Sequence, residues 1–184
     1  MEEGAVKLRF QPLTTEVDAL VRFLTSESWD YHGNPNPSAA EIREVFKQGY
    51  YTGEDVETFW IVIDSGRKIG LIRIFDLQDP TPLFDIRITR PYRGMGIGEK
   101  AVKWLTHHVF THHPGAIRIE GRTRKDNYAM RKVFFKCGYV REAYHRKAWP
   151  SSDGTLHDSV GYGITREDWE ENKVTPVDWG EVPF

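Results

Sequence analysis

The sequence has few of the features that secreted or membrane proteins need. It contains a single cysteine, Cys137, which excludes an intrachain disulfide and is typical of a reducing compartment. Its longest apolar runs, such as residues 59–63, have the length of a strand and are too short to span a membrane. Residues 1–4 are acidic and polar and lack the pattern of a signal peptide. We therefore expect a cytoplasmic protein without a membrane partner.

A large excess of charge of one sign is also missing. The formal net charge of the 184 residues is −2, which gives no electrostatic support for a nucleic-acid partner. Hydrophobic residues make up 39% and charged residues 28%, as in ordinary globular proteins. No repeat or linker divides the chain. We expect one domain over residues 1–173 and an irregular tail over 174–184.

Apolar periodicity predicts alternating strands and helices. Strands are expected at residues 6–10, 58–64, 69–77, 83–89, 116–123, 139–149 and 155–164. Helices are expected after the capping signals at 14–18 and 38–41, from Ile97 to a stop at 113–115, from an Asp126 N-cap to Gly138, and over 165–171. Residues 28–37, between the first two helices, are predicted to form a turn-rich loop carrying exposed aromatic side chains.

The most distinctive segment is Arg93-Gly94-Met95-Gly96-Ile97-Gly98, which joins an expected strand to the central helix. Glycines at such a junction allow a tight turn and a close backbone approach to a ligand, because no Cβ is in the way. The N–H groups of the first helical turn then favour an anion. The segment therefore predicts a site for a phosphate or pyrophosphate group.

Two other phosphate loops were compared with this segment. A P-loop requires Gly-Lys followed by Ser or Thr, whereas Gly98 is followed by Glu99 and Lys100. The dinucleotide pattern G-x-G-x-x-A is satisfied, and Glu120 lies at about the right distance for a ribose contact. That unit normally begins its domain, however, and here three expected strands precede it. The dinucleotide interpretation is therefore disfavoured.

The pattern Arg93-x-x-Gly96-x-Gly98 resembles the acetyl-CoA loop of the GNAT (Gcn5-related) N-acetyltransferase superfamily. A second segment, Asn127 followed after ten residues by Gly138 and Tyr139, is similar to a later helix of that family. The resemblance implies an α/β (α+β) fold, with a mixed, mostly antiparallel sheet, helices on both faces and splayed central strands. It also implies acetyl transfer from acetyl-CoA, as co-substrate, to a primary amine of a protein N-terminus or a small molecule. The terminal hairpin makes the ribosomal-protein N-acetyltransferase branch the closest match.

The resemblance also implies which residues hold coenzyme A. The pyrophosphate would bind the loop, and the pantetheine arm would bind the backbone of the preceding strand. The later helix would lie near the thiol. The implied cofactor residues are Ile86, Ile88, Arg93, Gly94, Met95, Gly96, Ile97, Gly98, Asn127 and Phe134.

The sequence departs from the family at the catalytic acid. Many relatives have a tyrosine seven residues after the asparagine, where this chain has Phe134, and the serine of the ribosomal-protein branch is replaced by Met130. An α-amine of pKa about 7.7 is roughly one-sixth neutral at pH 7 and needs little help from a base. The absence of the family's catalytic acid therefore favours an α-amine, or another amine of low pKa, as the acceptor. Asp85, Tyr144 and His145 are the candidate catalytic acids or bases.

The sequence also suggests substrate contacts, and it leaves alternatives for the oligomeric state and the function. Trp29, Tyr31 and His32 are candidate substrate contacts, because the loop between the first two helices borders the acceptor in relatives. His108 and His112 have helical i, i+4 spacing, but the glutamate of an H-E-x-x-H motif is absent and no metal is expected. A homodimer is one alternative for the oligomeric state. A small-molecule acetyltransferase and a non-catalytic acyl-CoA-binding regulator are the alternative functions.

Overall fold

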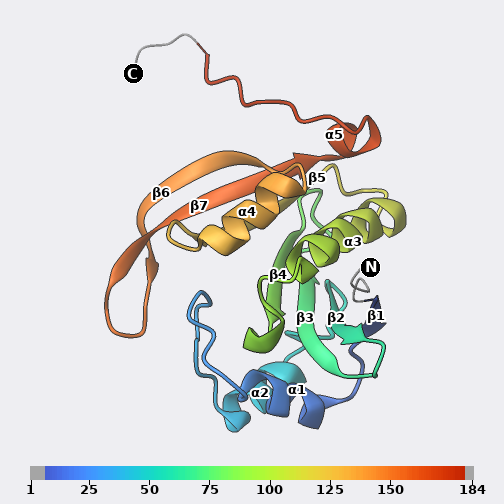
Figure 1. Cartoon of the computed structure of the whole chain (residues 1–184), viewed down its shortest axis with the longest axis vertical. Coiled ribbons are helices and arrows are strands. Elements are labelled where there is room, and N and C mark those ends of the chain that lie inside the picture. Colours follow the sequence, from blue (N-terminus) through green and yellow to red (C-terminus); the bar gives the residue numbers. More distant parts are fainter. Residues whose placement is uncertain (1–6, 181–184) are drawn as a thin grey trace, which may run out of the picture.

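The computed structural model describes residues 7–180, in which seven strands form one sheet in the order β1-β2-β3-β4-β5-β7-β6 (Figure 1). All neighbouring strands are antiparallel except β4 and β5, which are parallel. The strands are β1 (Leu8–Pro12), β2 (Val56–Ile63), β3 (Lys68–Phe75), β4 (Leu83–Ile88), β5 (Arg118–Arg124), β6 (Val140–Pro150) and β7 (Leu156–Thr165).

Helices cover both faces of this sheet, α1 and α2 on one face and α3 and α4 on the other (Figure 1). The helices are α1 (Val17–Leu24), α2 (Ala39–Lys47), α3 (Ile97–His112), α4 (Tyr128–Lys136) and α5 (Arg166–Glu170), with a short 3-10 helix, η1 (Arg90–Tyr92), after β4. Within residues 7–180, none of these helices has the length and apolar character needed to cross a membrane.

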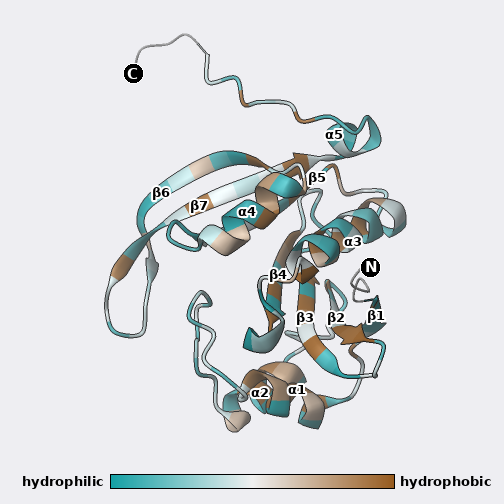
Figure 2. Cartoon of the chain, in the orientation of Figure 1, coloured by the Kyte–Doolittle hydropathy of each residue, from teal (hydrophilic) through white to brown (hydrophobic). Residues whose placement is uncertain are grey.

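Strand β2 contributes side chains to two hydrophobic clusters, one on each face of the sheet. Phe59 and Ile61 pack in the cluster beneath α3, whereas Trp60 and Val62 pack against α1 and α2. Successive side chains of a strand point to opposite faces, so a strand covered on both sides is apolar at nearly every position. Brown segments on β2, β3 and β4 in Figure 2 mark these hydrophobic strands at the centre of the fold.

Most expected elements are confirmed, and the differences concern their ends. The first strand begins at Leu8, and residue 6, where we expected it to start, lies outside the described residues. Asn127, not Asp126, is the N-cap of α4, and its side chain accepts a hydrogen bond from the Met130 N–H. The expected capping box before α1 is wrong, because Glu16 is the N-cap position and no side chain caps that helix.

The sheet opens between β4 and β5, which pair only at Leu83 and Glu120. The Thr89 N–H donates to the Ile69 carbonyl at 2.9 Å, and from there every second residue of β4 directs its backbone N–H and C=O groups to β3. Asp85 and Arg87 therefore use their backbone groups toward β3, and the backbone groups of Ile86 and Ile88 point toward the gap. In the described chain no strand pairs with β4 there. The expected splay of the central strands is confirmed.

The first residues after α5 are held to that helix by hydrogen bonds. Thr175 donates its backbone N–H and its hydroxyl to the buried Asp168 carboxylate, at 3.1 and 2.6 Å. Residues 174–180 form no helix or strand, and the end of the expected tail lies outside the described residues.

Candidate active site

The glycine loop leads from β4 into α3 and presents backbone to open space. Gly94 and Gly96 have φ angles of +76° and +75°, in the left-handed region that favours glycine. A Cβ added at either residue would meet no atom within 4 Å. No side chain in the described residues caps the first turn of α3, which leaves its N–H groups for an external partner. The loop therefore fits a phosphate group.

Arg93 supports this loop from within the protein. Its Nε donates to the Ile88 carbonyl at 2.8 Å, and its guanidinium forms an ion pair with Glu27. The same carboxylate accepts a hydrogen bond from the Arg90 N–H at 2.9 Å. The structure thus gives Arg93 a positioning contact, and its expected contact with pyrophosphate stays a prediction. Glu27, a single acidic residue with no surrounding pattern, was not expected.

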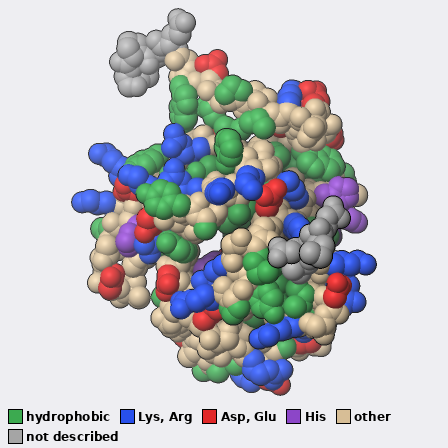
Figure 3. All heavy atoms as spheres, in the orientation of Figure 1, with side chains coloured by type: hydrophobic (Ala, Val, Ile, Leu, Met, Phe, Trp, Pro, Cys, Tyr) green, Lys and Arg blue, Asp and Glu red, His purple; other side chains and the backbone are tan. Residues whose placement is uncertain are grey.

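A cavity of about 490 Å³ lies next to the gap between β4 and β5. The surface is hollowed between the part of the molecule that carries β6, β7 and α4 and the part that carries α1 and α2 (Figure 3). Among the residues that line the cavity are Tyr31, His32, Tyr51, Arg73, Asp85, Ile86, Arg87, Arg122, Asn127, Phe134 and Trp149. The structure therefore brings together candidates for acceptor, cofactor and catalytic roles that are far apart in the sequence.

His32 and Asp85 form a pair in this cavity. His32 Nδ1 lies 3.0 Å from Asp85 Oδ1, with the two side chains 19% and 27% exposed. Burial is the largest influence on Asp85 and raises its pKa, but His32 and Arg87 outweigh it and hold the pKa below the ordinary aspartate range. A carboxylate that accepts from Nδ1–H leaves the other ring nitrogen, Nε2, as the basic atom. We expected His32 and Asp85 separately, not as a pair.

Three arginines give the cavity a basic side. Arg73 is only 8% exposed and donates to the Tyr50 carbonyl at 2.6 Å. Arg87 lies 3.5 Å from Asp85, and its Nη1 is buried without a hydrogen-bond partner in the described chain. Arg122 bonds Glu120 at 2.8 Å. The sequence signal for Arg73 was available, since it interrupts an otherwise apolar strand, whereas Arg87 belongs to the polar face of the alternating strand β4.

Tyr51 adds a hydroxyl to the same lining. It is 7% exposed, and burial raises the pKa of its phenol to about 12, so it keeps its proton at neutral pH. Neither Tyr51 nor Trp149 was among the expected site residues. The sequence around each of them does not distinguish an aromatic side chain that lines a site from one that only packs in the core.

Phe134 and Asn127 both line the cavity and both have structural contacts. Phe134 is 1% exposed and stacks on Tyr162 with ring centroids 4.5 Å apart. A Cβ at Gly121 would lie 2.6 Å from the Phe134 ring, so this glycine makes room for the phenylalanine. Asn127 also donates to Thr123 Oγ1 at 3.0 Å. Their expected cofactor contacts stay predictions.

Three of the candidate catalytic and substrate-binding residues lie outside the cavity lining. Tyr144 and His145 are on β6, where the Tyr144 hydroxyl accepts a hydrogen bond from Lys125 at 2.9 Å and donates one to Asp158. Trp29 is 2% exposed, and its Nε1 donates to the Leu24 carbonyl at 2.9 Å. The expectation that the aromatics of this loop are all exposed is therefore wrong for Trp29, because Phe23 of α1, Arg87 and Arg93 pack against it.

Comparison with known families decides what this architecture is. The model of the family described as "Acetyltransferase (GNAT) domain" matches residues 7–140. The chain belongs to the GNAT acetyltransferase family. The protein is an acetyl-CoA-dependent N-acetyltransferase, and the expected GNAT fold is confirmed. A search of curated proteins found no match.

Solved structures with the GNAT fold are similar over nearly the whole chain. A chimera of spermidine N-acetyltransferase from Vibrio cholerae and hSSAT is 17% identical, with a TM-score of 0.79 and coverage of 89% of this chain and 98% of that one. The Vibrio cholerae enzyme with CoA and spermine is 16% identical, with a TM-score of 0.76 and the same coverage. A structure described as a probable acetyltransferase is 19% identical, with a TM-score of 0.74 and coverage of 88% and 94%. These likenesses show the shared GNAT fold.

Proposed function

We propose that this acetyltransferase acetylates an α-amine that enters the cavity beside His32 and Asp85. The observation that carries the proposal is the position of the open edge of β4. Its backbone lies between the glycine loop at one end and the cavity at the other. An acetyl group delivered along this edge would meet an amine held in the cavity.

The coenzyme side of the proposal is supported by backbone geometry. Acetyl-CoA supplies the acetyl group as a reactive thioester. Gly94 and Gly96 leave open space at the loop, where the first-turn N–H groups of α3 can donate to phosphate oxygens. The backbone groups of Ile86 and the N–H of Ile88 face the gap, where they can bond an extended arm, whereas the Ile88 carbonyl already accepts from Arg93. Gly94, Met95, Ile97 and Gly98 complete the proposed cofactor site.

His32 is the proposed general base. Its Nε2 accepts the proton that the amine loses as the amine nitrogen bonds to the acetyl carbon. The carbon–sulfur bond then breaks, and the coenzyme A thiolate leaves and takes a proton from solvent. Asp85 acts through His32, because its carboxylate 3.0 Å away orients the ring and stabilises the imidazolium. Tyr31 and His32 remain the proposed substrate contacts from the loop, and Trp29 supports that loop from the core.

The charges of the cavity support an acceptor that is not a polycation. The side chains of Arg73, Arg87 and Arg122 line the cavity and outnumber its two carboxylates. Of these, Asp85 faces His32 and Arg87, and Glu41 accepts a hydrogen bond from the Ser38 N–H. A polyamine would bring further positive charges toward these arginines. An α-amine with nearby carbonyl or carboxylate oxygens would instead accept hydrogen bonds from Arg87 Nη1. This is consistent with an acceptor such as the N-terminus of a protein, as in the ribosomal-protein branch.

Release of coenzyme A thiol should be measured with three acceptors: a peptide with an unblocked N-terminus, spermidine and an amino sugar. We expect the peptide to give the highest kcat/KM and an acetylated α-amine by mass spectrometry. The same peptide with a blocked N-terminus and a free lysine is the matched control and should react far more slowly. Preference for spermidine would contradict the acceptor assignment. Binding of acetyl-CoA without turnover of any amine would favour a regulator.

A further inference from the structure

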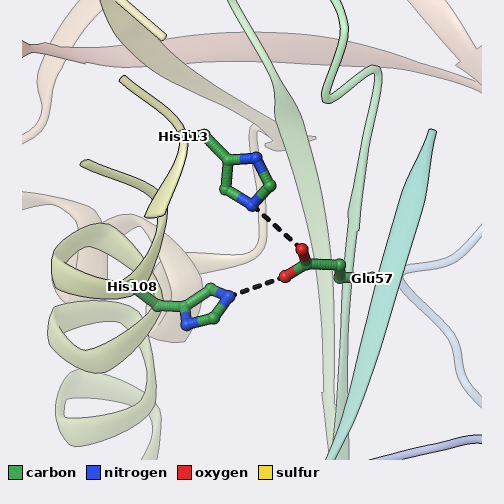
Figure 4. A group of neighbouring side chains, drawn as sticks. All are labelled: Glu57, His108 and His113. Atoms are coloured by element: carbon green, nitrogen blue, oxygen red, sulfur yellow. Dashed lines mark hydrogen bonds and ion pairs between the residues drawn. The ribbon is translucent and has the colours of Figure 1, made fainter. Parts of the chain in front are cut away.

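The end of α3 carries a cluster that the acetyl-transfer site does not use. Glu57 from β2 lies between two histidines, with Oε2 2.6 Å from His108 Nε2 and Oε1 3.0 Å from His113 Nε2 (Figure 4). His108 lies eleven residues beyond Ile97, hence about 16 Å along the helix from the glycine loop. The cluster is therefore separate from the proposed active site.

The three side chains have the donor atoms and spacing of a metal site. One ligand atom from each lies within 4.8 Å of the other two. Ligand atoms about 2.0–2.1 Å from a tetrahedral Zn²⁺ are about 3.3 Å apart, so small side-chain movements would bring the three donors around one ion. Two imidazoles and a carboxylate are a donor set that suits Zn²⁺ and other divalent transition metals.

The surroundings of His108 fix the orientation of its ring. Trp104 stacks on it with centroids 5.0 Å apart and planes 16° apart, and His112 packs against it at 4.5 Å. Phe59 approaches the ring edge-on at 5.0 Å. A ligand held in one orientation loses little freedom when it binds an ion.

His113 adds an independent observation. Its Nε2 is buried and, although it faces Glu57, makes no hydrogen bond of acceptable geometry with any described residue. A buried ring nitrogen without such a partner carries a desolvation cost that a metal–nitrogen bond would offset. The Glu57 side chain is 35% exposed, which leaves room for water to complete the coordination.

We propose that Glu57, His108 and His113 bind one divalent transition-metal ion, for which Zn²⁺ is the natural probe. The ion joins the beginning of β2 to the end of α3 and takes the place of the hydrogen bond between His108 and Glu57. The i, i+4 spacing in the sequence concerns His108 and His112. The proposed ligands are instead His108 and His113, together with a glutamate that lies far away in the sequence. The assignment is independent of the acetyl acceptor.

The test uses the full chain without an affinity tag, stripped with a chelator. Zn²⁺ is titrated in competition with a chromophoric chelator, and Co²⁺ is titrated while the visible absorption of tetrahedral cobalt is followed. We expect one ion per chain and a rise in the thermal unfolding midpoint on adding Zn²⁺. Glu57→Gln and His113→Gln should each weaken Zn²⁺ binding by at least about 100-fold, because each removes a ligand.

His107→Gln is the matched control, since it removes a neighbouring histidine of the same helix whose ring packs against Trp169 instead of His108. We expect it to bind Zn²⁺ with the affinity of the unmodified chain and to show the same thermal shift. Glu57→Gln keeps a side chain of the same shape, so we expect it to fold normally. Circular dichroism verifies that it does. Absence of saturable Zn²⁺ binding to the unmodified chain overturns the proposal. Equal loss in His107→Gln and His113→Gln also overturns it.

Discussion

The glycine loop and the acceptor cavity adjoin the same strand, but they are built in different ways. The loop uses backbone groups of consecutive residues, and its two left-handed glycines leave open space. The cavity uses side chains from the loop after α1, from β3, β4 and β5, and from the hairpin at Trp149. One region is continuous in sequence, whereas the other exists only in the folded chain.

The difference separates two kinds of recognition. Backbone donors bind a phosphate in much the same way whichever side chains flank them. In the proposed function an acceptor is recognised by charged side chains such as Arg87 and Asp85, whose positions depend on packing. On this proposal the loop identifies the cofactor, and the cavity selects the amine. Substitutions in the two regions should fail in different ways.

The largest expected effect is that of Gly96→Val. We expect acetyl-CoA binding to be lost by calorimetry, because a branched side chain would project where the phosphate approaches and would strain a φ of +75°. The matched control is Gly66→Val, in the turn between β2 and β3, where φ is +81° and the surroundings are equally open. It should incur similar strain, about 1–2 kcal/mol, and bind acetyl-CoA normally. Normal binding by the Gly96 variant would contradict the assignment of the loop.

A smaller effect is expected from His32→Gln, which addresses only the cavity. Turnover should fall by about 100-fold or more, the usual range for loss of a general base, while acetyl-CoA affinity is unchanged. Asp85→Asn should show a comparable loss, and the double variant should be little worse, because Asp85 acts through His32. His145→Gln is the matched histidine control. A loss confined to His145→Gln would place the base on β6 instead.

Arg87→Lys tests how the cavity selects its acceptor. It keeps a positive charge near Asp85 but removes Nη1, which is buried without a partner. One hydrogen bond to a charged group contributes about 1.5–3 kcal/mol, so the KM for an α-amine substrate should rise by about 10-fold or more with kcat retained. Arg43→Lys, on the exposed side of α2, is the control. An unchanged KM would show that this guanidinium does not contact the acceptor.

The smallest functional effect is expected from Gly121→Ala, which affects the packing beneath the gap. Its Cβ would lie 2.6 Å from the Phe134 ring, so we expect a loss of about 1–3 kcal/mol in the free energy of unfolding, measured with denaturant. Gly115→Ala, where a Cβ meets nothing within 4 Å, should change stability much less. Equal stability of the two variants would mean that Phe134 can move aside.

Much of the fold could be predicted from the sequence because its signals are local. The alternation in β4, the glycine loop and the Ser38 capping box each lie within a few residues, and the Ser38 box forms as expected. The N-cap of α4 was misplaced by one residue because Asp126 and Asn127 are both good caps and only geometry distinguishes them. Exposure of Trp29 was misjudged because its cover comes from other elements.

The acceptor side could be predicted only in part. Asp85 and His32 were each candidates, but their pairing joins residues more than fifty positions apart. Tyr51 and Trp149 carry no motif, and their convergence with Arg73 is a property of the folded chain. The proposed metal ligands show the same limit, since Glu57 on strand β2 reaches His108 on helix α3. Sequence spacing finds ligands on one helix and misses those supplied by a neighbouring strand.

The opening of the sheet at β4 has a further consequence. An unpaired strand edge is usually a hazard, because it can pair with another chain and start aggregation. Here the edge lies inside the molecule, where β5 meets it at one end and the glycine loop follows the other. Such an edge can accept a narrow, extended ligand by β-augmentation but gives a whole foreign strand little access. Extended inhibitors with peptide-like donors and acceptors therefore match it better than compact ring systems.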